Sequence, residues 1–360
     1  MLTSINKKKQ RYLMKLFIKN ISLFLIGTIL IASIFILPCF TILPYQTGDL
    51  GKMNGIPFGP YDTIFKTPDF LFTENISTYD SLQYVEILTI GDSFSQGYAF
   101  GYQNYLGNHL DKTISNIRID GISSINAAAT LIEKKMIPNC KVLIIESVER
   151  YLISNLNEET TIAENIKQQK IISGSLELEQ TGHKEIRYGF FDLFKLTSYY
   201  KTKFFSAAKY KKLTLSIPLF TAGNYSHSLY IYYNKAHNDG DLLFADITEM
   251  QILKAKNKLA ELQRLGASHN IQIIYLVAAD KYDMYYDFIQ DNPYPANPTL
   301  EYFSDADSTF FVNSKQVLIP YLRNGIKDIY RVNDTHWSPK AAKIVGEHLG
   351  RIIKDKQALN

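Results

Sequence analysis

Residues 85–95 read VEILTIGDSFS, and this stretch decides the fold. Its first half is a short apolar run that stops at Gly91, which is typical of a strand buried inside a parallel sheet. A helix is expected to follow from about Gly97 to Leu110. The Gly-Asp-Ser sequence between them therefore lies in a turn from strand to helix. Such a turn presents the hydroxyl of Ser93 at the carboxyl edge of the sheet, beside the free N–H groups of the next helix.

Strand and helix continue to alternate after this turn. A helix is expected between a capping box at Asp246 and Glu249 and a closing glycine at Gly266. Another is expected to begin at Ser338-Pro339, a good N-cap and first-turn pair. Further strands are expected at 116–120, 142–145 and 271–277, and a further helix at 125–137. This alternation predicts an α/β fold of three layers, with a parallel sheet flanked by helices.

The N-terminal segment is basic and is followed by a long apolar stretch. Residues 1–19 contain six cations and no acid, whereas the whole chain has a net charge of only +4. The basic character therefore belongs to this leader and does not indicate a nucleic-acid-binding face, so no nucleic-acid partner is expected. Residues 20–44 are long and apolar enough to cross a bilayer as a helix.

Because the cations precede the apolar stretch, the positive-inside rule places the N-terminus in the cytoplasm. We therefore expect a single-pass protein of the inner (cytoplasmic) membrane with a periplasmic, extracytoplasmic main domain. A cleaved signal peptide is the alternative.

The domain boundaries follow from changes in composition. Residues 1–19 form a cytoplasmic basic leader and 20–44 a transmembrane anchor. Residues 45–80 are rich in glycine and proline without a clear period, which indicates a stalk. The catalytic domain is expected at 81–355, interrupted by a charged, tyrosine-rich insertion at about 151–245 that would serve as a lid or an acceptor-binding surface.

The residues of a catalytic triad can be identified in two distant motifs. A serine hydroxyl needs a base, and histidine is the usual one because its pKa lies near neutrality. His336 stands out among the histidines, because Asp334 two residues earlier can hold one ring nitrogen and leave the other facing Ser93. The alternative is structural: the Gly-Asp-Ser turn is an ordinary helix cap, Asp334 and His336 cap the last helix, and Trp337 fills the core.

Three motifs together resemble a known family. They are Gly-Asp-Ser-Phe-Ser at 91–95, Asp-Thr-His-Trp-Ser at 334–338, and Ile-Glu-Ser-Val-Glu-Arg at 145–150. They are similar to motifs of the alginate O-acetyltransferase AlgJ/AlgX family, which belongs to the SGNH hydrolase superfamily. Tyr275–Tyr285, which contains Lys281, is similar to a further segment of that family. The triad order of serine first and histidine last differs from AlgJ/AlgX and matches ordinary SGNH esterases and DltD-like anchored proteins.

The resemblance implies an SGNH-hydrolase-like domain with a specific chemistry. Ser93 would form the acyl-enzyme, His336 would act as general base and acid, and Asp334 would orient it. The acceptor would be an exported polysaccharide, and the acyl donor would be delivered by a membrane O-acyltransferase.

Further residues are weaker candidates for the oxyanion hole or for substrate binding. The backbone N–H of Ser93 is the surest oxyanion donor. The other candidates are Gly121, Asn126, Arg150 and Trp337. Gly121 is equally well explained as a turn glycine, and Arg150 as half of an ion pair with Glu149. No metal site and no cofactor are expected, because the sequence contains no zinc motif and no phosphate-binding glycine loop.

The sequence therefore predicts an extracytoplasmic O-acyltransferase, most simply an O-acetyltransferase, that modifies a cell-surface or exported polysaccharide. One alternative is an SGNH esterase or deacetylase that hydrolyses acyl esters on a glycan. A second alternative is a glycan-binding subunit that has the fold without the activity.

Overall fold

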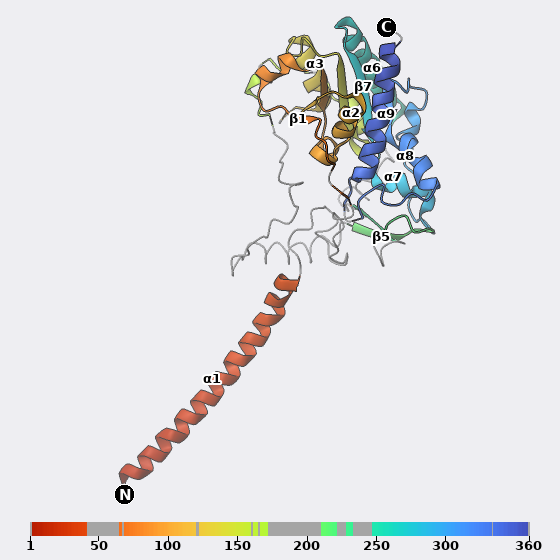
Figure 1. Cartoon of the computed structure of the whole chain (residues 1–360). Helices are drawn as coiled ribbons and strands as arrows, with labels where there is room; N and C mark the ends of the chain where they lie inside the picture. The colour runs from red at the N-terminus through yellow and green to blue at the C-terminus, as the bar shows by residue number, and fades with distance from the viewer. Residues whose placement is uncertain are drawn as a thin grey trace.

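A six-stranded parallel sheet with helices packed against it forms the centre of the computed structural model (Figure 1). The main-sheet order is β1-β3-β2-β4-β7-β8. The structure describes residues 2–41, 65–66, 68–119, 122–159, 161–164, 166–171, 210–221, 228–232, 247–332 and 334–358. The strands are β1 (Thr73–Asn75), β2 (Ile87–Ile90), β3 (Ile114–Ile117), β4 (Val142–Val148), β5 (Tyr210–Thr214), β6 (Ser228–Tyr232), β7 (Gln272–Ala278) and β8 (Phe311–Asn313). The chain is therefore an α/β protein.

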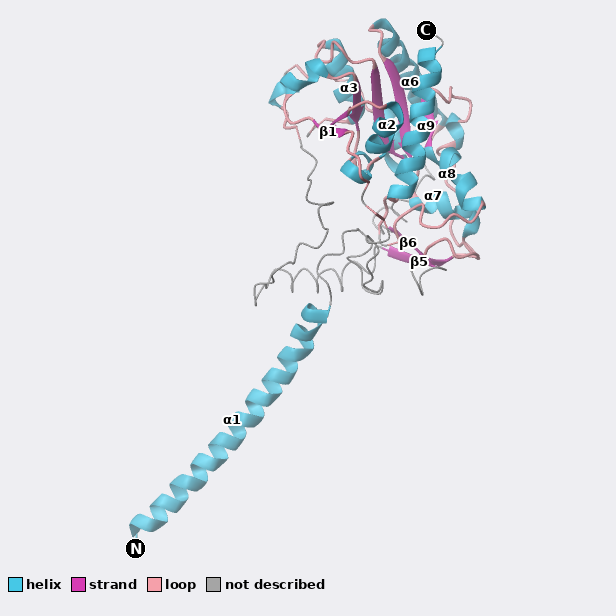
Figure 2. Cartoon of the chain, in the orientation of Figure 1, coloured by secondary structure: helices cyan, strands magenta, loops and turns pink. Residues whose placement is uncertain are grey.

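The helices form one layer on each side of this sheet (Figure 2). In one layer α2 packs along α9, and α8 packs against α9; in the other, α6 contacts both α3 and α4. The α-helices are α1 (Leu2–Thr41), α2 (Tyr102–Leu110), α3 (Ser124–Glu133), α4 (Leu152–Asn157), α6 (Glu249–Ser268), α7 (Lys281–Tyr285), α8 (Ser314–Arg323) and α9 (Pro339–Ala358). Short 3-10 turns lie at η2 (Tyr79–Tyr84), η3 (Ser93–Ser95), η4 (Tyr98–Phe100), η5 (Glu149–Tyr151), η6 (Ile166–Gln168), η12 (Tyr286–Phe288) and η13 (Glu301–Phe303).

The two central strands are buried along their whole length. Every residue of β2 and β4 is buried, because helices cover both faces of a parallel sheet. Ile87 pairs with Val142 and Ile90 with Ile145, so the two strands begin side by side and β4 continues past the end of β2 to Val148. The chain leaves β2 toward α2 and leaves β3 toward α3, on opposite sides of the sheet. In open parallel sheets a crevice forms at such a reversal, next to the carboxyl ends of the strands.

Several boundaries differ from those expected from the sequence. The strand expected at 116–120 is β3, which begins earlier, at Ile114. β1 pairs with β3, so the folded domain begins inside the segment expected to be a stalk. Three residues are too few to give a strand pattern in the sequence, which is why β1 and β8 were not predicted.

The expected insertion contains parts of the main fold. α4 packs against α6, so the folded domain continues beyond residue 151. β5 and β6 form a separate antiparallel pair. Most of the remaining insertion lies outside the described residues, and so does Asp246 of the expected capping box. The capping box of α6 is formed by Thr248 and Gln251 instead.

The N-terminal helix α1 is long and apolar enough to span a membrane (Figure 1). Its apolar part runs over Arg11–Ser33, with a mean hydropathy of 1.9 and no buried residues. The hydroxyl of Thr28 donates to the carbonyl of Phe24 at 2.8 Å, which satisfies it within the helix. A signal sequence near an N-terminus meets the same criteria of length and composition.

We expect Gly346→Ala to destabilise the fold. A Cβ at this position of α9 would lie 2.5 Å from the carbonyl oxygen of Tyr102 and 2.9 Å from the backbone nitrogen of Leu106, so α9 would have to move away from α2. Alanine is a better helix former than glycine by about 1 kcal/mol, but overpacking costs about 1–3 kcal/mol. Urea unfolding should therefore show a net loss of stability.

The matched control is Lys343→Ala on the exposed side of the same helix. It should change the free energy of unfolding by no more than about 0.5 kcal/mol. A Gly346→Ala variant as stable as the unaltered chain would contradict the close packing of α2 on α9.

Candidate active site

The turn after β2 presents Ser93 to solvent. Ser93 opens the 3-10 turn η3 and its residue is exposed, whereas Phe94 and Ser95 behind it are buried. Gly91 allows this turn to fold closely onto its surroundings. A Cβ on Gly91 would lie 2.2 Å from Ser95 Oγ and 2.5 Å from Glu146 Oε2, so a larger residue would force these side chains to move.

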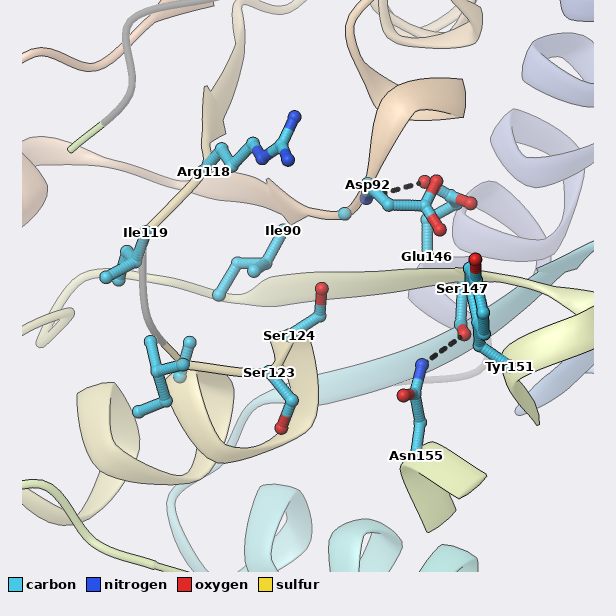
Figure 3. A pocket seen from close by; sticks show the side chains of 13 residues that line it. Ile90, Asp92, Arg118, Ile119, Ser123, Ser124, Glu146, Ser147, Tyr151 and Asn155 are labelled. Atoms are coloured by element: carbon cyan, nitrogen blue, oxygen red, sulfur yellow. Dashed lines mark hydrogen bonds between the residues drawn. The ribbon is translucent and has the colours of Figure 1, made fainter. Parts of the chain in front are cut away.

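A fully buried carboxyl group at the end of β4 holds the turn from below. Glu146 Oε2 accepts hydrogen bonds from the backbone N–H of Asp92 at 3.0 Å and from Ser95 Oγ at 2.9 Å. Figure 3 shows the first of these bonds. Both strands that end at this edge therefore contribute to the position of Ser93.

The side chain of Asp92 adds two further links between the same strands. Its Oδ1 accepts from the backbone N–H of Phe94 at 3.1 Å, and its Oδ2 accepts from that of Val148 at 3.2 Å. Burial, and next the nearby charge of Asp92, raise the pKa of Glu146 well above its usual range. The Glu146 carboxyl therefore favours its neutral form.

The structure brings Ser93, His336 and Asp334 together. His336 Nε2 lies 2.6 Å from Ser93 Oγ, and His336 Nδ1 lies 2.6 Å from Asp334 Oδ1. The backbone N–H of His336 also donates to Asp334 Oδ1 at 3.1 Å. A carboxylate can only accept, so the proton of a neutral imidazole resides on Nδ1 and Nε2 is left to accept from the serine hydroxyl.

The Asp334 carboxylate stays ionised beside this histidine. Burial by itself would raise the pKa of Asp334, but the hydrogen bond from the His336 ring, its charge, its backbone N–H and the charge of Arg331 outweigh burial and lower that pKa below its usual value. An ionised Asp334 stabilises the imidazolium that forms when His336 takes a proton.

Aromatic side chains pack behind the histidine. The Phe94 ring lies 4.7 Å from the His336 ring and makes an edge contact with Trp337 at 5.0 Å between centroids. Trp337 also meets Tyr102 edge-on at 6.1 Å. These contacts limit rotation of the imidazole and connect α2 to the segment that precedes α9.

The weaker candidates that the structure describes have structural contacts of their own. Gly121 lies outside the described residues. The side-chain amide of Asn126 donates to the carbonyl of Glu159 and its oxygen accepts from the N–H of Thr161, so it links α3 to the following segment. Trp337 is 5% exposed and belongs to the core rather than to a substrate-binding surface.

Arg150 forms an ion pair, but its partner is Asp280 and not Glu149. Glu149 is buried and accepts from the backbone N–H of Asp280 at 2.8 Å and from Asn297 Nδ2 at 2.5 Å. The expected pairing of adjacent residues is therefore wrong. Adjacent side chains in an extended or 3-10 segment diverge, whereas the ends of β4 and β7 lie next to each other.

Glu146 is the site residue whose role the sequence analysis missed. A signal was available, because an ionisable residue inside an otherwise apolar strand needs a specific partner. The sequence could not name that partner, since the N–H of Asp92 and the hydroxyl of Ser95 are brought to Glu146 only by the pairing of β2 with β4.

A pocket of about 260 Å³ is lined in part by Gly91 and Asp92 of the turn after β2 (Figure 3). It lies between the ends of β2 and β4 and the beginning of α3. Hydroxyl and amide groups line much of it, from Ser123, Ser124, Ser147 and Asn155. Asp92 and Glu146 also line it, and the amide of Asn155 donates to Ser147 Oγ at 2.9 Å.

The arrangement suits attack by a serine on an acyl group. His336 can accept the serine proton, and the exposed hydroxyl can reach a carbonyl carbon. Among the described residues the backbone N–H of Ser93 has no hydrogen-bond partner, so it can donate to an oxyanion. Within the described part of the chain, no cluster of histidine, cysteine and carboxylate side chains has the arrangement of a metal site.

No model of a known protein family matches the chain, and no curated protein sequence matches it. The chemistry of the site is therefore inferred from its own geometry and from the three sequence motifs.

We expect Glu146→Gln to change the pH dependence of stability. The raised pKa of Glu146 means that its contribution to folding is complete below the unfolded pKa of 4.5 and is lost as the pH rises through the folded pKa. Glutamine has the same shape and stays neutral. The stability of Glu146→Gln relative to the unaltered chain should therefore improve from about pH 4 to about pH 8, measured by urea unfolding.

Glu86→Gln is a control for which the stability relative to the unaltered chain should change with pH in the opposite direction. The hydrogen bond from Lys112 lowers the pKa of Glu86, so its contribution is present above pH 4.5 and is lost as the pH falls. Relative to the unaltered chain, Glu86→Gln should become less stable as the pH rises. The same slope for both variants would contradict a neutral Glu146.

Proposed function

We propose that the protein is a membrane-anchored O-acyltransferase of the SGNH type that uses a Ser93 acyl-enzyme. The main support is the continuous hydrogen-bonded line from Ser93 Oγ through the His336 ring to Asp334, with 2.6 Å at each step. Two of the three groups come from one short segment and the third from a strand end far away in the sequence. A helix cap alone would not require the imidazole to contact the serine.

The reaction begins with attack of Ser93 Oγ on the carbonyl carbon of an acyl ester. His336 Nε2 takes the hydroxyl proton, and Asp334 stabilises the resulting imidazolium. The negative charge that develops on the carbonyl oxygen is stabilised by the backbone N–H of Ser93. When the intermediate collapses, the ester bond of the donor breaks and His336 returns the proton to the leaving alcohol.

The second half reverses these steps with a new alcohol. A hydroxyl of the acceptor attacks the Ser93 ester while His336 takes its proton. The bond to Ser93 Oγ breaks, and the serine recovers the proton from the imidazolium. One ester is consumed and one is formed, so no oxidant, reductant or cofactor is needed.

We propose an acetyl group as the acyl unit and a cell-surface or exported polysaccharide as the acceptor. The resemblance to the alginate O-acetyltransferase family supports both choices. The pocket beside Asp92 supports the acceptor, because its hydroxyl and amide groups match the hydrogen-bonding pattern of a sugar ring. A membrane O-acyltransferase would supply the acyl group.

The proposed location is the extracytoplasmic side of the inner membrane. The support is the apolar helix over Arg11–Ser33 together with the cations that precede it in the sequence. An exported glycan would meet the catalytic domain on that side.

Hydrolysis of acyl esters is the second candidate function. It is favoured by the exposure of Ser93, because water can reach an acyl group on an exposed serine. The same triad would serve an esterase or deacetylase. A glycan-binding subunit without catalysis has less support, since binding alone does not need the aligned Ser93, His336 and Asp334.

We expect an activated acetyl ester such as 4-nitrophenyl acetate to acetylate Ser93 in the full chain purified in detergent. Intact-mass and peptide analysis should find one acetyl group on Ser93, none in Ser93→Ala, and an acylation rate lowered by roughly three orders of magnitude or more in His336→Gln. Ser268→Ala removes an exposed serine on α6 and should react like the unaltered chain. Equal labelling of Ser93→Ala would refute the acyl-enzyme.

Transfer and hydrolysis can be separated by the fate of the acetyl group. An O-acetyltransferase should form acetylated product when an unacetylated oligosaccharide is added to the acetyl-enzyme, and free acetate should decrease by the same amount. Product analysis by mass spectrometry measures both. Free acetate as the sole product with every oligosaccharide offered would establish the esterase instead.

A further inference from the structure

Lys281 is buried directly beneath the loop that holds two of the three triad residues. It opens α7 after β7, and only 4% of it is exposed. Its Nζ donates to the backbone carbonyl oxygens of Arg331 at 2.6 Å, Val332 at 3.2 Å and Asp334 at 2.9 Å. All of these carbonyls belong to the segment that immediately precedes His336.

The geometry matches the donor capacity of an ammonium group. A protonated lysine has three N–H donors and no acceptor, and three carbonyl oxygens receive them here. Burial of a charge is costly unless hydrogen bonds compensate it. Among the described residues no carboxylate forms an ion pair with Lys281, so backbone carbonyls provide this compensation.

The segment contacted by Lys281 is a closed loop. Tyr330 and Trp337 pair as an antiparallel bridge, and the N–H of Arg331 donates to the carbonyl of His336 at 3.2 Å. The carbonyls of Arg331, Val332 and Asp334 accept from one ammonium, while the Asp334 carboxylate holds the His336 ring that contacts Ser93. Loss of the ammonium would remove one hydrogen-bond donor from each of these three carbonyls.

We propose that Lys281 is a positioning residue, whose ammonium fixes the backbone at Arg331, Val332 and Asp334 so that Asp334 and His336 stay aligned with Ser93. The effect of Lys281 on catalysis rests on the function proposed above, whereas its effect on the geometry of His336 does not. A shift of about 1 Å in catalytic geometry can slow a reaction by about 100-fold. A fixed loop is therefore a requirement of the triad.

The protonation of Lys281 gives this role a pH dependence. Burial lowers the pKa of Lys281 from 10.5 to about 7, although the charge of Asp334 opposes this shift. The Phe220 ring lies 5.2 Å from Nζ. Arg331 and His336 share the contacted loop, and on its own helix Asp283 is paired with Lys315. A neutral amine has two N–H donors, so one carbonyl loses its partner above neutral pH.

Folding stability and alignment should respond to this titration in opposite directions. The unfolded chain binds the proton of Lys281 up to about pH 10.5 and the folded chain only up to about pH 7, so this residue makes stability rise with pH between these values. The loop loses a donor over the same range. A fall in activity above neutral pH would therefore not be a consequence of unfolding.

The test compares Lys281→Met, Lys281→Arg and Lys258→Met in the full chain in detergent. Lys258 is the matched control, because it is a buried lysine of α6 whose pKa burial also lowers. Acylation of Ser93 by 4-nitrophenyl acetate should be about 10- to 100-fold slower in Lys281→Met, chiefly through kcat with KM little changed. Lys258→Met should retain the unaltered rate.

The pH profile separates positioning from a general loss of structure. The acylation rate of the unaltered chain should fall above neutral pH as Lys281 loses its proton. That fall should be absent in Lys281→Met, and absent also in Lys281→Arg, whose side chain stays charged. A Lys281→Met variant with the rate and the pH profile of Lys258→Met would overturn the proposal.

A second readout does not depend on catalysis. In spectra of chain with ¹⁵N-labelled histidine, the His336 signals are assigned by their absence from His336→Gln. They should show Nδ1 protonated in the unaltered chain and in Lys258→Met, and a mixed or exchanging ring in Lys281→Met. Unchanged His336 signals in Lys281→Met would refute the positioning role even if Ser93 proves unreactive. An unreactive Ser93 with altered His336 signals would refute the proposed function alone.

Discussion

The hydrogen bond between His336 Nε2 and Ser93 Oγ joins two segments that are 243 positions apart in the chain. The rest of the domain is arranged so that this contact forms. Ser93 follows β2, and His336 precedes α9 by a few residues. α2, the first α-helix after Ser93, packs along α9, so both segments enter one helical layer. The fit depends on Gly346, where α9 approaches the backbone of α2 closely.

The sequence predicted the central strands and the triad because both leave strong local signals. The apolar run before Gly91 is short but stops sharply at the glycine, and Asp334 and His336 have the spacing that a carboxylate needs to hold an imidazole. The contacts of Asn126 and Arg150 were harder to predict, because their partners are Glu159 and Asp280, which lie elsewhere in the sequence. These contacts depend on which distant segments the fold brings together, such as the ends of β4 and β7, and local periodicity does not reveal that. Short strands such as β1 could not be predicted either, because three residues are too few to show an alternating pattern.

Buried ionisable groups organise the site at both of its ends. Glu146 accepts from the N–H of Asp92 and the hydroxyl of Ser95 beside Ser93. Lys281 donates to the carbonyls around Asp334 beside His336. A fully buried carboxyl and a fully buried amine are each costly alone, and each is stabilised by hydrogen bonds to backbone or hydroxyl groups. Ser93 can therefore lie exposed while the residues that hold the site in place lie in the core.

The central claim is that Ser93 and His336 react as one unit, and a crystal structure of the chain after treatment with an organophosphonate tests it most directly. The account predicts phosphorus bonded to Ser93 Oγ, a phosphonyl oxygen directed at the Ser93 backbone N–H, and His336 Nε2 within hydrogen-bond distance of the adduct. An unmodified Ser93, or an adduct with the His336 ring turned away toward another partner, would contradict it.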